Sequence, residues 1–229
     1  MKSCIAIWGL VFLCLATGAK AAPVPVYVQN KSAAVTSAEL VDAMPAFQAA
    51  VSEDFAPVWG TDCKLILGYP PKGAMRIVLT DNVDVWGALG YHWVFTGAPT
   101  SKVFPQMSED NGVSWQLVFT HELFEMLADP WVNRASLSKR TALMPPRWWL
   151  VEVADPVEDT AFTYTKPGIS GTPVEISDFI TPAWYGGAPP YDFTGHVTRP
   201  LQILDGGYAN YWMNGRWNNI TVGASKWGD

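Results

Sequence analysis

Apolar and polar positions recur along the first third of this chain in patterns that distinguish strands from helices. Alternation predicts a strand at 24–30, and apolar residues three or four positions apart predict one long helix from about Thr36 to Trp59. Ser37 is the candidate N-cap, and Pro45 is where a bend would fall. Apolar runs at 63–69 and 74–82, joined by the turn-forming "PPKG", predict two more strands.

The patterning continues through a central helix and then changes. Residues 88–104 read as extended segments on either side of "TGAPT", and 105–112 as a loop. A dense apolar run predicts a helix at 113–128, which Pro130 limits. Next, "RWWLVEVADPVED" reads as a strand that enters an Asp-Pro turn, and a turn-rich remainder has short strands around the segments 162–165, 174–180 and 209–222.

These elements predict an α+β fold. It would contain a mixed sheet, a long N-terminal helix and a central helix, followed by an irregular β-rich half. We expect one domain over residues 22–229, with a helix-and-sheet half at 22–146 and a β-rich half at 147–229.

The first 21 residues have the pattern of a signal peptide. Lys2 precedes the apolar core "CIAIWGLVFLCLA", and "AKA" ending at Ala21 is an A-x-A cleavage signal. No later stretch has about 18 continuous apolar residues, the length of a membrane span. We therefore expect a secreted or periplasmic protein with no stable membrane anchor after cleavage.

Charge and cysteine content narrow the class of protein further. The chain has 15 basic and 21 acidic residues, and loss of Lys2 and Lys20 with the signal would leave 13 basic ones and a net charge near −8. Such a charge argues against nucleic acid as a partner. Cys63 would be the only cysteine left, and its apolar setting, "CKLILGY", predicts a buried, unreactive thiol. The 49% hydrophobic content argues against disorder.

Acidic side chains and a histidine interrupt the central apolar helix, in the stretch "THELFEMLADP" at 120–130. His121, Glu125 and Asp129 stand at i, i+4 and i+8 and therefore share one stripe, with Glu122 about 100° round the helix. Buried carboxylates need cations, and few basic residues are near in sequence. The pattern predicts a metal site, and the alternative is a buried hydrogen-bond network.

The motif "HELFE" resembles the HExxH helix of zinc metallopeptidases, with Glu125 in place of the second histidine. The order of elements over about residues 24–160 is similar to the upper half of the zincin fold. The resemblance implies that His121 and Glu125 bind the metal and that Glu122 acts as general base. It implies zinc, although the carboxylate at Glu125 also suits manganese or calcium. The whole chain also resembles a group of uncharacterised exported bacterial proteins with a HELxE helix, which implies no activity.

A third metal ligand is expected downstream of the helix. Glu152 in "VEVADPVED" is favoured, followed by Asp155 and then by Asp129. His92 precedes the central helix, in "GYHW". In zincins that segment lines the substrate cleft, so His92 would bind substrate or stabilise an oxyanion, and the alternative is a packed histidine.

These residues predict an exported, metal-dependent, peptidase-like hydrolase that acts on a peptide or a cell-wall-type substrate. Two alternatives stay open. One is a non-catalytic binding protein that a metal stabilises. The other is a carbohydrate-binding or glycoside-hydrolase domain, because "DGGYANYWMNGRWNN" at 205–219 combines aromatic, amide and glycine residues.

Overall fold

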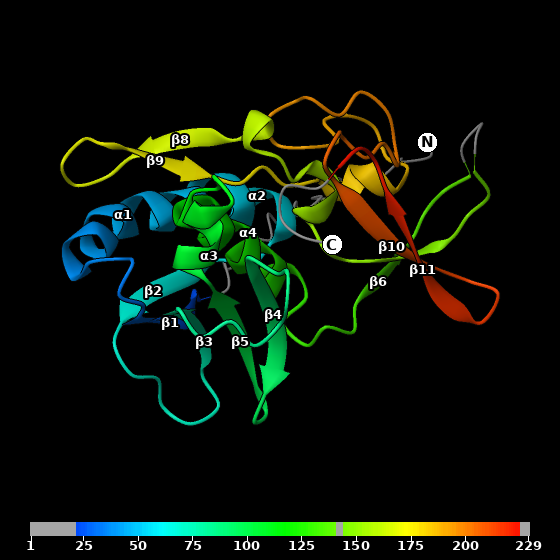
Figure 1. The fold of residues 1–229 in the computed structure, drawn as a ribbon. Coiled ribbons are helices and arrows are strands. Elements are labelled where there is room, and N and C mark those ends of the chain that lie inside the picture. The colour runs from blue at the N-terminus through cyan, green and yellow to red at the C-terminus, as the bar shows by residue number, and fades with distance from the viewer. Residues whose placement is uncertain (1–21, 141–143, 225–229) are drawn as a thin grey trace, which may run out of the picture.

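The computed structural model describes residues 22–140 and 144–224 and has the predicted α+β fold (Figure 1). Its α-helices are α1 (Ser37–Ala49), α2 (Ala56–Trp59), α3 (Pro105–Asp110) and α4 (Trp115–Ala128). Its strands are β1 (Val24–Lys31), β2 (Cys63–Leu67), β3 (Met75–Thr80), β4 (Gly90–Phe95), β5 (Ala98–Val103), β6 (Ala135–Leu137), β7 (Trp148–Leu150), β8 (Tyr164–Pro167), β9 (Pro173–Ile176), β10 (Tyr208–Met213) and β11 (Arg216–Thr221). The predicted signal peptide lies outside the described residues. Within 22–140 and 144–224, no helix has the length and apolar character needed to cross a membrane.

Five strands form the first sheet, in the order β2-β1-β3-β5-β4. All neighbours are parallel except β4, which pairs antiparallel with β5 at one edge. The β4–β5 hairpin turns at Thr96 and Gly97, both with positive φ (50° and 76°), as a two-residue hairpin turn of type I′ requires. Cys63 begins β2 and is buried as predicted, and burial raises the pKa of its thiol to about 12.

Strands β2 and β3 lie on opposite sides of β1, so the connection at 68–74, which contains the predicted "PPKG" turn, must cross β1. The register keeps this crossing short. Val26 of β1 is level with Leu65, in the middle of β2, and with Met75, the first residue of β3. The chain therefore has only a small distance to return before β3 begins.

The predicted long N-terminal helix is present but not uniform. Its N-cap is Thr36 and not Ser37, because Thr36 forms a capping box with Glu39 and leaves Ser37 as the first helical residue. Pro45 lies inside α1, and the departure from α geometry comes later, in the π-helical segment Ala50–Phe55 that leads into α2.

The structure differs from the sequence predictions at three places. The expected loop at 105–112 contains α3, whose Pro105 suits the first helical position because no amide is needed there. The predicted strand before the Asp-Pro turn is present as β7 but ends at Leu150, so Glu152 lies beyond it. Strand β6, which pairs with β7, was not predicted.

Helix α4 lies between the first sheet and the β8–β9 hairpin, with the second sheet (β11-β10-β7-β6) to one side (Figure 1). Ser114 caps it, and Asp129 ends it. Its polar residues hold the hairpin in place: the amide of Ser177 donates to Thr120 Oγ1 (2.9 Å) and the amide of Glu175 donates to Gln116 Oε1 (3.1 Å). Consequently α4 is covered by protein on all sides.

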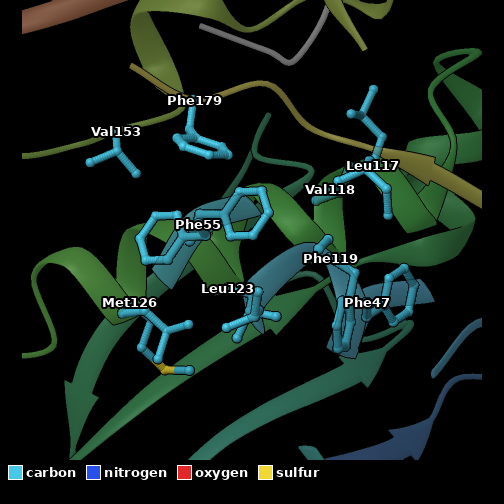
Figure 2. Close-up of a cluster of buried hydrophobic side chains, with 14 of the residues drawn as sticks. Phe47, Phe55, Leu117, Val118, Phe119, Leu123, Met126, Val153 and Phe179 are labelled. Carbon is cyan, nitrogen blue, oxygen red and sulfur yellow. The ribbon is translucent and has the colours of Figure 1, made fainter. Parts of the chain in front are cut away.

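Phenylalanine side chains join the helices to the segment after β9. Phe55 stacks on Phe124 of α4 (ring centroids 4.9 Å apart, 2° between planes), and both rings meet the edge of Phe179 at about 70°. Figure 2 shows Phe179 above Phe55, with the stacked pair Phe47 and Phe119 at the lower right. This cluster brings residues from three parts of the chain into one core.

A buried carboxyl pair organises the loops that follow β9. Asp178 Oδ1 accepts from the amides of Phe179 and Thr194, and Asp192 accepts from the amides of His196 and Val197. Burial raises the pKa of Asp178 to about 8, with the charge of Asp192 acting in the same direction. Burial therefore favours the protonated form of Asp178, which is hydrogen-bonded to Asp192.

Phe55→Ala should lower the free energy of unfolding by about 3–5 kcal/mol, because it opens a cavity where three rings meet. Urea unfolding followed by circular dichroism measures this change. The matched control is Tyr69→Ala, which removes a side chain that is 85% exposed and should change stability by less than about 0.5 kcal/mol. Similar losses in both variants would contradict the assigned core.

Asp178→Asn should make stability less dependent on pH. The folded-state pKa of Asp178 is raised, so its stabilising contribution is present below about pH 4 and is lost as pH rises towards 8. Asparagine imitates the protonated acid. As pH rises through this window, the free energy of unfolding of the variant should therefore increase relative to that of the wild type, by up to about 1 kcal/mol per pH unit. Unfolding curves at pH 5 and pH 8 give the free energy of unfolding at each pH. An equal change between the two pH values in the variant and the wild type would refute the prediction.

Candidate metal centre

Helix α4 supplies three polar side chains to one buried cavity. His121, Glu122 and Glu125 are each only 4% exposed, although the rest of the helix is packed in the apolar core. The one-turn spacing brings His121 Nε2 within 3.4 Å of Glu125 Oε2. The predicted stripe of His121 and Glu125 is therefore present, with Glu122 facing the same cavity.

Strand β4 faces these side chains from the first sheet. His92 is 9% exposed, and its Nδ1 lies 3.6 Å from Glu125 Oε2 and 3.8 Å from Glu122 Oε2. Two residues earlier, Gly90 makes this approach possible, because a Cβ there would lie 2.8 Å from Glu122 Oε1. The sequence prediction placed His92 in the substrate cleft, and the structure brings it directly into contact with the acids.

The segment after β7 closes the opposite side. Val151 and Val153 are buried in the core while Glu152 points to the cavity, so the predicted alternation continues past the end of the strand. The amides of Ala154 and Asp155 both donate to Glu125 Oε1 (3.2 and 3.3 Å). These bonds orient Glu125 so that its other oxygen faces the histidines.

Two overlapping groups of side chains have the spacing of metal ligands. The first contains His121, Glu125 and Asp155, with His121 Nε2 at 3.3 Å from Asp155 Oδ1. The second contains His92, Glu125 and Glu152, with His92 Nε2 at 3.6 Å from Glu152 Oε2. The structure thus groups Asp155, and not the favoured Glu152, with His121.

Crowding of acids in a buried space shifts the pKa values of the carboxyl groups apart. Burial raises the pKa of Glu122 to about 8 and that of Asp155 to about 7, and the neighbouring charge of Glu125 acts in the same direction. Burial and the charges of Glu125 and Asp155 also raise the pKa of Glu152 well above its usual range. Burial alone would raise the pKa of Glu125, but His121 and His92 together outweigh it, and that pKa falls.

The same acids affect both histidines. Burial alone would lower the pKa of His121, but Glu125 and Asp155 outweigh it and raise that pKa well above its usual range. The pKa of His92 is raised for the same kind of reason, with Glu125 as its main acidic neighbour. The acidic side chains therefore strongly favour positive charge in this cavity.

The cavity has a volume of about 220 Å³, and its rim includes residues from the segment 205–219 that the sequence analysis did not assign to this site. Tyr208 and Asn210 enter from β10, and Tyr208 is hydrogen-bonded to Asp155. Gly207 allows β10 to come this close, because a Cβ there would lie 2.7 Å from the carbonyl oxygen of Asp155. The glycines of "DGGY" were the available signal, but their partner is distant in sequence.

Asp129, the third alternative for a ligand, has another role. Its carboxylate accepts from the amides of Asn133 and Arg134 and so holds the turn after α4. It belongs to none of the potential metal-binding groups found among the described residues. A further group, Asp178, Asp192 and His196, is engaged by the backbone amides described above.

The donor set of the cavity fits a divalent cation. Imidazole nitrogen and carboxylate oxygen bind zinc, and a set rich in oxygen also suits manganese or calcium. Three buried atoms, His92 Nε2, Glu122 Oε2 and Glu152 Oε2, have no hydrogen-bond partner within the described part of the chain. Buried polar atoms without partners are costly, so their presence around one cavity supports a ligand there.

The geometry of this cavity is the basis for any functional assignment, since other proteins provide none. Comparison of the chain with protein-family models, with curated proteins and with solved structures finds no match.

Proposed function

We propose that this chain is an exported, metal-dependent hydrolase of peptidase-like type, with a divalent cation held by His121, Glu125 and Asp155. One observation carries the proposal: a histidine and two carboxylates lie within ligand spacing of one another, buried at a cavity open to small molecules. Zinc is the proposed cation, and manganese or calcium are the alternatives. When bound, such a cation polarises a carbonyl and makes water more acidic.

Glu122 is the proposed general base. It follows a ligand directly in α4, lies in neither metal-binding group, and faces the same cavity. Its Oε2 has no hydrogen-bond partner among the described residues, and a cation held by the neighbouring ligands would lower its raised pKa, so that the ionised side chain could accept a proton from an attacking water. Gly90 leaves room for this carboxylate, because a Cβ at that position would lie 2.8 Å from Glu122 Oε1.

The rim residues would orient the substrate. Asn210 offers an amide that can both donate and accept, and Tyr208 is held by Asp155. A peptide or a cell-wall-type peptide presents amide groups that match these partners. The proposed reaction is attack of water on the carbonyl carbon of such an amide. Glu122 takes a proton from the water and then gives it to the amine nitrogen as the C–N bond breaks, which leaves a carboxylate and a free amine.

A row of exposed tryptophans favours one second candidate, binding of a sugar polymer. Trp148, Trp212 and Trp217 are level with one another on β7, β10 and β11 and are 42–48% exposed. They therefore share one face of the second sheet. Trp212 and Trp217 meet edge to face (75°), so each ring would stack on a sugar separately. This surface would serve a wall-bound hydrolase as well as a non-catalytic binding protein.

Glu122→Gln should separate metal binding from catalysis. Glutamine keeps the size of the side chain but cannot take the proton, so hydrolysis should fall by about 10²-fold or more. Metal content should stay near that of the wild type, because Glu122 is not a proposed ligand. Elemental analysis of the purified protein, together with rates on a panel of peptides and peptidoglycan fragments, measures both quantities.

The matched control for that experiment is His121→Ala. It should lose the metal and the added thermal stability together, since a ligand at a hundred times its Kd contributes about 2.7 kcal/mol. Undiminished metal content in this variant would end the assignment of the site. If Glu122→Gln hydrolyses as fast as the wild type, Glu122 is not the base.

Trp212→Ala should weaken retention on insoluble cell-wall polysaccharide by about tenfold, as expected for losing one stacked aromatic ring. Trp86→Ala is the control, because that side chain is 93% exposed and is not part of the row. A co-sedimentation assay measures retention. Equal retention of both variants and the wild type would rule out a role for this face in binding sugar.

A further inference from the structure

We propose that the cavity binds two divalent cations, with the second held by His92, Glu125 and Glu152. The inference rests on the proposed metal site at His121 and deepens it. Glu125 belongs to both groups of potential ligands, whereas the two histidines share no group among the described residues. Glu125 would therefore bridge the two cations.

The contact distances favour cations over hydrogen bonds. His121 Nε2 lies 3.4 Å from Glu125 Oε2 and His92 Nε2 lies 3.6 Å from Glu152 Oε2, whereas hydrogen bonds between charged nitrogen and oxygen are about 2.7–2.9 Å long. Two donors at about 2.0–2.1 Å from one tetrahedral zinc ion lie about 3.3 Å apart. The nitrogen–oxygen spacings in the cavity are close to this value.

His92 gives a second, independent argument. Its Nδ1 faces Glu122 and Glu125, and its Nε2 faces Glu152. A neutral imidazole donates from only one nitrogen, so one lone pair of the ring must point at a carboxylate. His92 Nε2 and Glu152 Oε2 are buried and have no hydrogen-bond partner in the described part of the chain. A cation bound by these two atoms would satisfy both and would leave His92 Nδ1 as the N–H that faces Glu122 and Glu125.

Charge compensation also favours two divalent cations. Four acidic side chains surround the two histidines, and the described lining of the cavity includes no lysine or arginine: Glu122, Glu125, Glu152 and Asp155. One divalent cation would balance two of these carboxylates when all four are ionised, and uncompensated charge in a buried space is costly. Two would balance all four while both histidines stay neutral and able to bind metal.

A bridging role also explains why a glutamate stands where the HExxH pattern has its second histidine. A carboxylate oxygen has two lone pairs and can bind two cations, whereas an imidazole nitrogen has one. The amides of Ala154 and Asp155 occupy Glu125 Oε1 and direct Oε2 towards both histidines. In known two-metal sites the ions lie about 3.5–4 Å apart, a separation that one shared carboxylate can span.

The test is the number of cations that the purified protein binds, counted by elemental analysis after equilibration with Zn²⁺ or with Mn²⁺. The wild type should bind about two per chain, as two-metal hydrolase sites do. His92→Gln and Glu152→Gln should each bind about one, because each removes a ligand of the second site only. Glu125→His should also bind about one, because imidazole cannot bridge.

The control is His196→Gln, which alters the exposed histidine of the remaining acidic group and should leave both cations bound. Electron paramagnetic resonance of the Mn²⁺-loaded wild type gives a readout that needs no variant. Bridged Mn²⁺ ions should give an exchange-coupled spectrum, and a lone ion would give the hyperfine pattern of isolated Mn²⁺. An uncoupled spectrum would overturn the proposal even if the variants fail to fold.

The outcomes distinguish the second site from the proposed function. If the wild type binds one cation that His92→Gln and Glu152→Gln retain and His121→Ala loses, the second site is refuted and the hydrolase proposal stands. A folded wild type that binds neither cation refutes both. Loss of one cation in His196→Gln would place the second ion away from the cavity and refute the bridge.

Discussion

Burial of negative charge inside an apolar core is the constraint on which the arrangement of this protein depends. Helix α4 carries Glu122 and Glu125 into a region from which water is largely excluded, and the surrounding elements are arranged around that charge. Backbone amides after β7 fix one carboxylate, and a glycine in β4 makes room for the other. A positively charged ligand in the cavity would compensate the negative charge that remains.

Much of this fold could be predicted from the chain because apolar spacing reports local structure. The central helix, the hairpin at Thr96 and Gly97, and most strands follow from residues close in sequence. The short helix α3 was missed because its polar, proline-led sequence is also typical of loops, and proline suits both settings. Which strands are neighbours, as when β1 separates β2 and β3, depends on tertiary packing and has no local signal.

The candidate site, like the fold, could be predicted from the sequence only in part. His121, Glu122 and Glu125 could be predicted together because helical geometry places them on neighbouring faces. The order of Glu152 and Asp155 could not, because a turn beyond β7 decides which carboxylate approaches His121. The part played by His92 depends on how close β4 lies to α4, and that distance is set by the missing side chain of Gly90.

The position of α4 has a further consequence for how this protein can vary. The floor of the cavity is made from the same helix that carries Phe119 and Phe124 into the core, so a change there alters chemistry and folding together. The rim comes instead from β10, whose strand reaches the cavity at one end and solvent at the other. Ligand selectivity can therefore diverge at the rim of this scaffold while the proposed metal site at its floor is kept.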